Sequence, residues 1–582
     1  MERPGRRRLI WYPPGMTGDP AKRGGWDRPL AMATLIAAAV LISRGILIAH
    51  FHGPTADENY HLYRGLLFLR QDWPHIYDAR WNDPPLGEAL SAIPAWLNGV
   101  RMSDPIHASA WSRDVPPLAK YCYVMPDSIR VETAIWKSIL FLPAVAVIFA
   151  WVRGAYSAGS AWLAVAMLLI EPNLAAHLPL PTLDGLGTEG IVIAAWAAWR
   201  FVCQPTPARQ WTAAAAMAIA LLVKHTALLL PVAALLMGAV AWLGPRSTPS
   251  ERWANARKLI VAAGLVAMFI WVLLLGDISV PRDFSNRPFF GKAGLGSHGI
   301  PAGLYVESVW EAMVHARTGQ ENYLLGQYSR MGWWYYFPVV ATYKIPIGIA
   351  AVMVLGLASL IWLKPRYEEA PLAICAALGT GAALLQHVDI GFRHFLPALV
   401  FWLMLASRVG SSRRWIWPAL AWLAMGWAAF DTARWSPDFL SYVNFPREFA
   451  YLDISDSNVD WGQATKELRR WVDRRPNDGR PIYLGYFGRA DQNLFEQIGP
   501  RLTQYLMNGG SWISRTASGE AGKMSVPTHG ILVLSPVLIT GQFDPSDRFA
   551  RFRNIPPEQV VGHGLLVYDL DKLSGSYRPS GR

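Results

Sequence analysis

One short segment near the N-terminus combines acidic, imidazole and guanidinium groups at helical spacing. Asp57 and Glu58 are adjacent acids, and Asp57, His61 and Arg64 would share one face of a helix. A carboxylate pressed against an apolar membrane surface has a raised proton affinity, which suits a general base. The competing interpretation is an acidic helix cap stabilised by the helix dipole. Asp57 and His61 could also ligate a divalent metal ion, although two ligands do not define a site.

Other polar residues stand where apolar runs begin or end. Asp83 precedes two prolines that stop a helix and set an extended turn. Asp184 begins an apolar helix, so it is either a functional residue or a helix N-terminal residue. Lys224 ends one apolar run, and Arg393 with His394 begins another. Phosphate binding at the membrane surface would explain these cations, and snorkelling to the interface is the alternative.

Aromatic residues gather at 331–338, ahead of Lys344. An interfacial aromatic belt is the ordinary meaning of such a run, whereas stacking of sugar rings is the sharper alternative. Tyr336 lies in this run and is a candidate for a loop that contacts substrate. For Lys344, snorkelling to the interface explains the residue at least as well as phosphate binding.

Apolar stretches near the ~20 residues that cross a membrane dominate the chain. We count eleven, at 30–51, 133–152, 160–170, 190–202, 211–223, 227–243, 259–275, 345–363, 372–385, 395–406 and 415–430. The first is too long for the apolar region of a signal peptide, and no small-residue cleavage site follows it. The sequence therefore predicts a mainly α, polytopic membrane helical bundle with about eleven transmembrane helices.

Basic residues alternate between the loops and predict the orientation of the chain. They place residues 1–29 in the cytoplasm and make 30–430 the membrane module, with outer loops at 53–130 and 277–333. The tail at 431–582 then lies outside. An amphipathic helix at 461–472 and strand-like runs at 481–487, 530–534 and 565–568 predict a small α/β domain there. Asp456, Ser457 and Asn458 are good helix caps and predict the start of the tail helix.

Composition agrees with a membrane protein and excludes other classes. Hydrophobic residues make up 52% of the 582 residues and charged residues only 16%, against about 25% in soluble domains. The net charge of +12 includes a basic cluster before the first apolar run, which indicates a cytoplasmic anchor rather than nucleic-acid binding. Three cysteines form no disulfide framework or metal spacing. We find no P-loop, GxGxxG, HExxH or GxSxG motif.

These motifs together resemble bacterial polyprenyl-phosphate-sugar-dependent glycosyltransferases of the GT-C superfamily, on the branch related to protein O-mannosyltransferases. The resemblance covers most of the chain. Its carriers are Asp57-Glu58, Asp83-Pro84-Pro85-Leu86, Leu183-Asp184, Lys224-His225-Thr226, Tyr323-Leu324-Leu325-Gly326, the aromatic run at 332–338, Lys344-Ile345-Pro346, the run at 391–397 that holds Arg393-His394, and the run at 456–463.

The resemblance implies an activity in the bacterial inner membrane. The donor would be a mannose-like hexose on a polyprenyl phosphate at the outer leaflet, and the acceptor a hydroxyl of a protein or glycan. Asp57 matches the catalytic aspartate of that family, which takes the acceptor proton while the anomeric configuration inverts. Glu58 matches the second, orienting acid, and Asp184 matches an acidic position near the active site. To these we add, from charge alone, donor-phosphate binding by Lys224, Arg393 and His394.

Some positions depart from the pattern of that family. Asn59, Tyr60 and His61 follow the acidic pair where an arginine or an alanine-rich helix is common, and Asp83 stands where many members have histidine or lysine. We expect His61 and Asp83, like Tyr336, in the loops around the substrate. Sugar, acceptor and any divalent-metal requirement stay open. The alternatives are a lipid-linked-sugar transporter or flippase, and a non-catalytic membrane protein whose tail binds a partner.

Overall fold

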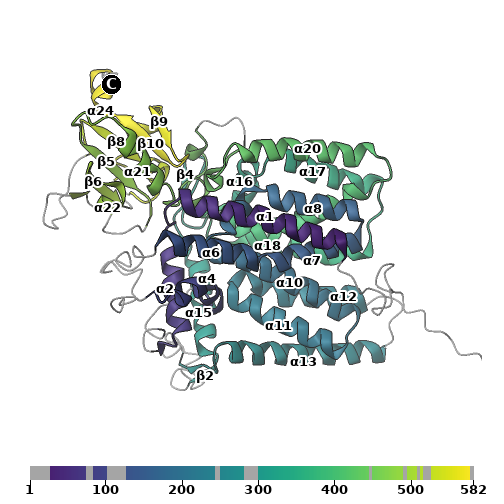
Figure 1. Ribbon diagram of the computed structural model, residues 1–582. Coiled ribbons are helices and arrows are strands. Elements are labelled where there is room, and N and C mark those ends of the chain that lie inside the picture. Colours follow the sequence, from purple (N-terminus) through teal and green to yellow (C-terminus); the bar gives the residue numbers. More distant parts are fainter. Residues whose placement is uncertain are drawn as a thin grey trace, which may run out of the picture.

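The structure is a computed structural model that describes residues 27–73, 76, 83–100, 126–242, 249–280, 299–444, 449–488, 494–507, 512–514, 526–544 and 546–576. Most of the expected cytoplasmic segment 1–29, and parts of the expected outer loops 53–130 and 277–333, lie outside these residues. The described chain forms a bundle of long apolar helices and a separate C-terminal α/β unit (Figure 1).

Seven helical segments are long and apolar enough to cross a membrane. They are α1 (Arg28–Phe51), α6 with α7 (Asp127–Leu140, Leu142–Ala155), α10 (Leu183–Cys203), η2 with α12 (His225–Leu228, Leu229–Trp242), α13 (Pro249–Leu273), η5 with α18 (Tyr367–Glu369, Ala370–Leu385), and η6, α19 and η7 (Phe392–Phe395, Leu396–Ala406, Ser407–Ser411). In Figure 1 these helices run across the picture beside one another.

The remaining predicted spans are also helical, but they are broken, short or less apolar. Helix α16 (Tyr336–Lys344) and helix α17 with η4 (Ile347–Ala358, Ser359–Ile361) are bent by 120° at their junction, and counting them as one span gives eight. Pro346 stands at the bend, where it cannot donate to a continuous helix. The others are α8 (Ala158–Ile170), α11 (Pro207–Val223) and α20 (Ile416–Ala433). The expected number of about eleven transmembrane helices is therefore larger than the seven or eight described segments that are long and apolar enough to cross a membrane.

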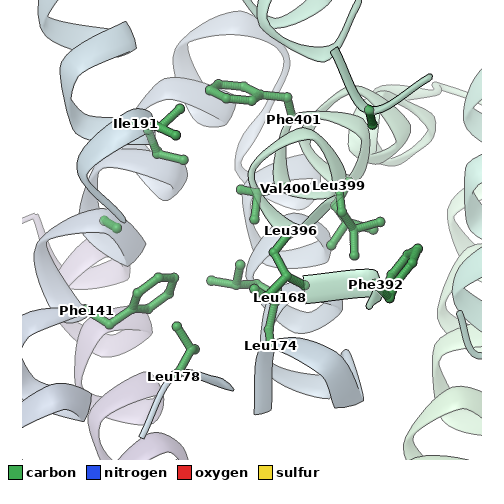
Figure 2. Close-up of a cluster of buried hydrophobic side chains, with 14 of the residues drawn as sticks. Phe141, Leu168, Leu174, Leu178, Ile191, Phe392, Leu396, Leu399, Val400 and Phe401 are labelled. Atoms are coloured by element: carbon green, nitrogen blue, oxygen red, sulfur yellow. The ribbon is translucent and has the colours of Figure 1, made fainter. Parts of the chain in front are cut away.

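The helices pack on a core of leucine, phenylalanine and small residues. Figure 2 shows one part of it, in which Leu168, Leu174 and Leu396 lie in the middle, with Phe141 on one side and Phe392 on the other. The side chains come from the end of α6, from α8, from α9 (Pro172–His177) and from η6 and α19. This packing draws the ends of sequence-distant helices together at the end of the bundle where polar residues collect.

Short elements cross that same end of the bundle (Figure 1). They are α2 (Glu58–Leu69), α4 (Pro85–Leu97), α15 (Gly303–Thr318), the strand pair β1 and β2 (Ile278–Ser279, Ile300–Pro301), and the strand pair β3 and β4 (Asn322–Leu324, Gln327–Ser329). Between α20 and the C-terminal domain, the described residues form the short turns η8 (Phe439–Ser441), η9 (Ala450–Leu452) and η10 (Asp456–Asn458).

The C-terminal domain contains a six-stranded sheet in the order β7-β6-β5-β8-β10-β9. Strand β5 pairs in parallel with β6 and β8, and the other pairs are antiparallel. The strands are β5 (Ile482–Tyr486), β6 (Leu502–Met507), β7 (Trp512–Ser514), β8 (Ile531–Leu534), β9 (Gln559–Val561) and β10 (Leu565–Asp569). The helices are α21 (Thr465–Arg474), α22 (Leu494–Ile498), α23 (Pro536–Thr540) and α24 (Leu570–Ser576), with the turn η11 (Ala550–Asn554).

Amphipathic helix α21 covers this sheet through Leu468 and Val472, which pack on β5 and β8 side chains. The predicted α/β character and its three strands are confirmed. The predicted cap is wrong, because Asp456, Ser457 and Asn458 form the 3-10 turn η10 and α21 begins later, at Thr465. The Asp456 carboxylate accepts a hydrogen bond from the backbone N–H of Ser457 at 2.6 Å, and Asp456 itself has a φ of +60°.

Lys344 ties the segment that follows α20 to the bundle. Its ammonium is buried and donates to the carbonyl oxygens of Leu440, Tyr442 and Asn458 at 2.9, 2.7 and 2.6 Å. All three Nζ–H groups therefore have a backbone acceptor. Neither snorkelling nor phosphate binding describes this residue, since its charge is held inside the protein by main-chain dipoles.

We expect Lys344→Met to lower the free energy of unfolding by about 2–4 kcal/mol, because three buried carbonyls lose their donor. Thermal unfolding of the detergent-solubilised protein measures this. Lys364→Met, at an exposed lysine near the other end of α17, is the matched control and should leave the unfolding temperature unchanged. Equal unfolding temperatures for the two variants would contradict the role of Lys344.

Candidate active site

Asp57 and Glu58 lie side by side at the start of α2 but have different surroundings. Asp57 holds the N-cap position, yet its side chain makes no capping hydrogen bond and is 32% exposed. Glu58 is buried, and its Oε1 accepts from the backbone N–H of Thr55 at 2.8 Å. Arg130 lies 3.7 Å from the other oxygen of Glu58. Glu58 therefore fastens the turn before the helix, which leaves the Asp57 carboxylate free of a capping role.

Arg393, on turn η6, is the partner of Asp57. Its Nη1 lies 3.3 Å from Asp57 Oδ2, and its guanidinium carbon lies 3.8 Å from the ring centroid of Trp461. Arg393 is buried, and its Nε has no hydrogen-bond partner among the described residues. The stacking on an indole fixes the plane of the guanidinium, and the unused N–H is available to an added oxygen ligand.

Asp184, in the first turn of α10, forms a buried ion pair with Lys224 at the end of α11. Gly187 makes this close approach possible, because a Cβ there would lie 2.9 Å from the Lys224 side chain. Asp184 stands at the N-terminus of a helix, which is the structural interpretation of this residue. It is also paired with a lysine, as a functional acid inside a membrane protein would be. Its partner Lys224 belongs to the same electrostatic cluster as Arg393.

Two histidines complete this cluster. His177, at the end of α9, tilts against the Trp461 ring at 5.7 Å between centroids, and His394 follows Arg393 directly. His177 Nδ1 and His394 Nε2 are buried without a hydrogen-bond partner among the described residues. Burial lowers the pKa of His177 to about 3 despite the nearby Asp184, so its ring is neutral at pH 7. Unpaired buried nitrogens at one place mark a polar site that is incomplete without a ligand.

Asp456 adds a third carboxylate near Arg393. Burial raises the pKa of Asp456 to about 6, and Asp57 adds to the effect while Arg393 opposes it. Gln542 donates to its Oδ2 at 3.3 Å. Asp456 comes from the run that the sequence predicted as a helix cap, and Trp461 from the start of the predicted tail helix. The only signal for their position was their place in the ordered motif series.

His61 and Arg64 share a partner that differs from that of Asp57. His61 Nδ1 lies 3.0 Å from Glu88 Oε1, and Arg64 Nε lies 3.0 Å from Glu88 Oε2. Arg64 also donates to the backbone carbonyl of Asp83 at 2.9 Å. Arg64 and Glu88 are both 0% exposed, so this ion pair joins α2 to α4 inside the protein. The segment is helical, as expected, but the three side chains form no single cluster: His61 and Arg64 pair with Glu88 on α4, whereas Asp57 pairs with Arg393.

The metal interpretation changes in the same way. His61 offers a ligand atom within 4.8 Å of atoms from Asp83 and Glu88, and Asp57 is not in this group. The Arg64 guanidinium already compensates Glu88, and a fixed cation inside the cluster opposes a second one. A metal ion held by Asp57 and His61 stays a prediction, and Asp57 is not in the group of three possible ligands that contains His61.

Tyr336 does not line a substrate loop. It is 1% exposed, and its hydroxyl accepts from Asn458 Nδ2 at 2.9 Å. Asn458 Oδ1 in turn accepts from the backbone N–H of Phe392 at 2.8 Å, directly before Arg393. Tyr336 and Asn458 thus hold the turn that carries Arg393. The expected substrate contact of Tyr336 is corrected to a buried, positioning role.

Comparison with known proteins gave structural similarities alone. No protein-family model matches, and no curated protein matches in sequence. The chain is similar to ArnT from Cupriavidus metallidurans bound to undecaprenyl phosphate, at 12% identity and a TM-score of 0.46, over 92% of this chain and 97% of that one. It is also similar to the oligosaccharyltransferase AglB from Archaeoglobus fulgidus in complex with an inhibitory peptide and a dolichol-phosphate, at 12% identity and a TM-score of 0.42, over 90% and 72%.

The ion pair between α2 and α4 provides a test of the contact that holds these two helices together. We expect Glu88→Met to lower the free energy of unfolding by about 3–5 kcal/mol, because the buried Arg64 guanidinium loses its carboxylate partner. The double variant Arg64→Met with Glu88→Met should be less destabilised than the single one. Thermal unfolding in detergent measures both, with the exposed Glu558→Gln as control. Additive losses in the double variant would show that the two side chains do not act as a pair.

Proposed function

We propose that this chain is a glycosyltransferase of the GT-C type that moves a sugar from a polyprenyl-phosphate donor to a hydroxyl of a protein or glycan. The observation that carries the proposal is the Asp57–Arg393 ion pair, which joins an accessible carboxylate to a buried cation with an unused N–H. The sequence motifs that resemble such enzymes supply most of the residues around this pair.

Asp57 is the carboxylate that suits a general base. Its side chain is 32% exposed, whereas those of Glu58 and Asp184 are 3% and 6% exposed and already hold other groups. An acceptor hydroxyl can therefore reach Asp57 without displacing a structural contact. Glu58, expected as a second catalytic acid, serves in this proposal to fix the turn that presents Asp57.

Lys224 and Arg393 suit the donor phosphate. Each is held in place by an acid, and both belong to one electrostatic cluster with His177 and His394. A guanidinium with a free N–H and an ammonium on a helix end are the ordinary ligands of phosphate oxygens. The cluster lies at the ends of apolar helices, and a polyprenyl-linked phosphate must also stay at a membrane surface.

The reaction follows from this arrangement. The acceptor oxygen attacks the anomeric carbon, and its proton passes to the Asp57 carboxylate. The new carbon–oxygen bond replaces the bond to the phosphate, which leaves with the electron pair as polyprenyl phosphate beside Arg393 and Lys224. Attack opposite the leaving group inverts the anomeric configuration. A mannose-like hexose is the sugar that we propose.

We further propose that the site and the domain at 431–582 lie on the outer side of a bacterial inner membrane, with residues 1–29 in the cytoplasm and 30–430 as the membrane module. The support is the alternation of basic loops along the sequence. The short elements and the C-terminal domain at one end of the bundle would then cover the site and exclude water, which otherwise hydrolyses the donor.

Asp57→Asn tests the general base. We expect kcat to fall by about 10²–10⁴-fold with folding unchanged, since the amide cannot accept the proton. Sugar transfer from a synthetic polyprenyl-phosphate hexose to a defined acceptor measures this. Asp473→Asn, at an exposed aspartate on α21, is the matched control and should keep full activity. Near-normal transfer by Asp57→Asn would contradict the proposal, and donor uptake into vesicles that survives the substitution would favour a transporter.

Arg393→Lys tests the phosphate contact. Lysine keeps the charge but loses the planar fork and the stacking on Trp461, so we expect the KM for the donor to rise by at least about tenfold. Steady-state kinetics with varied donor measure this, with Arg413→Lys at the opposite end of the bundle as control. If the KM changed for the acceptor and not for the donor, Arg393 would contact the acceptor, and its proposed role in binding the donor phosphate would be wrong.

A further inference from the structure

A second polar cluster lies where the bundle meets the C-terminal domain. It combines His52, directly after α1, with Asp438 after α20, Glu467 on α21 and His563 in the turn between β9 and β10. His52 Nε2 lies 2.7 Å from Asp438 Oδ1, and His563 Nδ1 lies 2.5 Å from Asp438 Oδ2. Ligand atoms of His52, Asp438 and Glu467 all lie within 4.8 Å of one another. Three separate parts of the chain thus converge on the Asp438 carboxylate.

The β9–β10 turn is shaped to deliver His563. Gly562 and His563 have φ of +58° and +48°, and Gly564 N donates to the Val561 carbonyl at 3.2 Å, as in a hairpin turn of the primed type. Histidine rarely adopts this backbone conformation, and such conformations persist where surrounding contacts impose them. A Cβ on Gly562 would lie 1.8 Å from Glu467 Oε2, so the glycine makes room for that carboxylate.

The cluster is incomplete as a hydrogen-bonded network. Glu467 Oε2 is buried and has no hydrogen-bond partner among the described residues, although it lies within reach of the other groups. His52 and Asp438 are buried, whereas the His563 side chain is 49% exposed and opens the cluster to solvent. An unused buried carboxylate oxygen beside two imidazoles is what a missing cation would satisfy.

We propose that His52, Asp438 and Glu467 bind a divalent transition-metal ion, with Zn²⁺ as the best match, and that His563 orients Asp438 through its hydrogen bond to Oδ2. Imidazole and carboxylate groups are both zinc ligands, and the imidazole disfavours Mg²⁺ and Ca²⁺, which prefer oxygen ligands alone. The site is separate from the Asp57–Arg393 pair and does not depend on the proposed transferase activity. Its ion would tie the end of α1 to the C-terminal domain.

Metal binding by the full-length protein in detergent tests this directly. After treatment with a chelator and its removal, titration with Zn²⁺ alone should show one tightly bound ion per chain by metal analysis. Binding should raise the unfolding temperature by at least about 3 °C, whereas Mg²⁺ should not. Co²⁺ in place of Zn²⁺ should give the visible absorption of a four-coordinate site with nitrogen and oxygen ligands. A wild-type chain that binds less than a tenth of an equivalent of Zn²⁺ would overturn the proposal.

Variants assign the ion to this cluster. Glu467→Gln should weaken Zn²⁺ binding by at least about tenfold without unfolding the protein, because Glu467 Oε2 has no hydrogen-bond partner among the described residues that the substitution would remove. His563→Ala should do the same. His529→Ala, at an exposed histidine of the same domain, is the matched control and should bind as the wild type does. Zn²⁺ affinity that survives both Glu467→Gln and His563→Ala would place the ion elsewhere and reject this site.

Discussion

The guanidinium of Arg393 joins the parts of the molecule that must meet for its site to exist. It pairs with Asp57 from the start of α2, it stacks on Trp461 from the segment before the C-terminal domain, and it shares a cluster with Lys224 and Asp184. A buried cation needs such compensation, because an unpaired charge in a low-dielectric interior is strongly destabilising. The same need that fixes Arg393 therefore draws three distant segments to one point.

Neutral hydrogen bonds, many of them to the main chain, also support the position of Arg393. Asn458 accepts from the backbone beside Arg393 and donates to Tyr336, while Lys344 is held by three carbonyls, one of them that of Asn458. These bonds order the segment after α20 without adding free charge to the site. They connect α16, η6 and the segment before the C-terminal domain, and so hold the turn that carries Arg393. The Arg393 Nε–H, which has no partner among the described residues, can then face a ligand.

The boundary between bundle and C-terminal domain carries a second concentration of charge around Asp438. Hydrogen bonds from His52 and His563 reach it from opposite sides of that boundary. The boundary therefore does more than connect two folding units, since it brings together side chains that neither unit holds alone. A ligand bound there would stabilise the arrangement of the domain over the end of the bundle, which is also where Asp57 lies at the start of α2.

The sequence by itself determined the helical spans, the α/β character of the tail and the collection of polar residues at helix ends, because hydropathy and periodicity are local properties. The tertiary structure alone decided the partners. Asp57 and Arg393 are 336 residues apart, and no spacing rule predicts their contact. Helical spacing predicted one shared face for Asp57, His61 and Arg64. In the structure, the buried Glu88 of α4 pairs with His61 and Arg64 and not with Asp57. Packing determines which charges lose water, and that loss selects their partners.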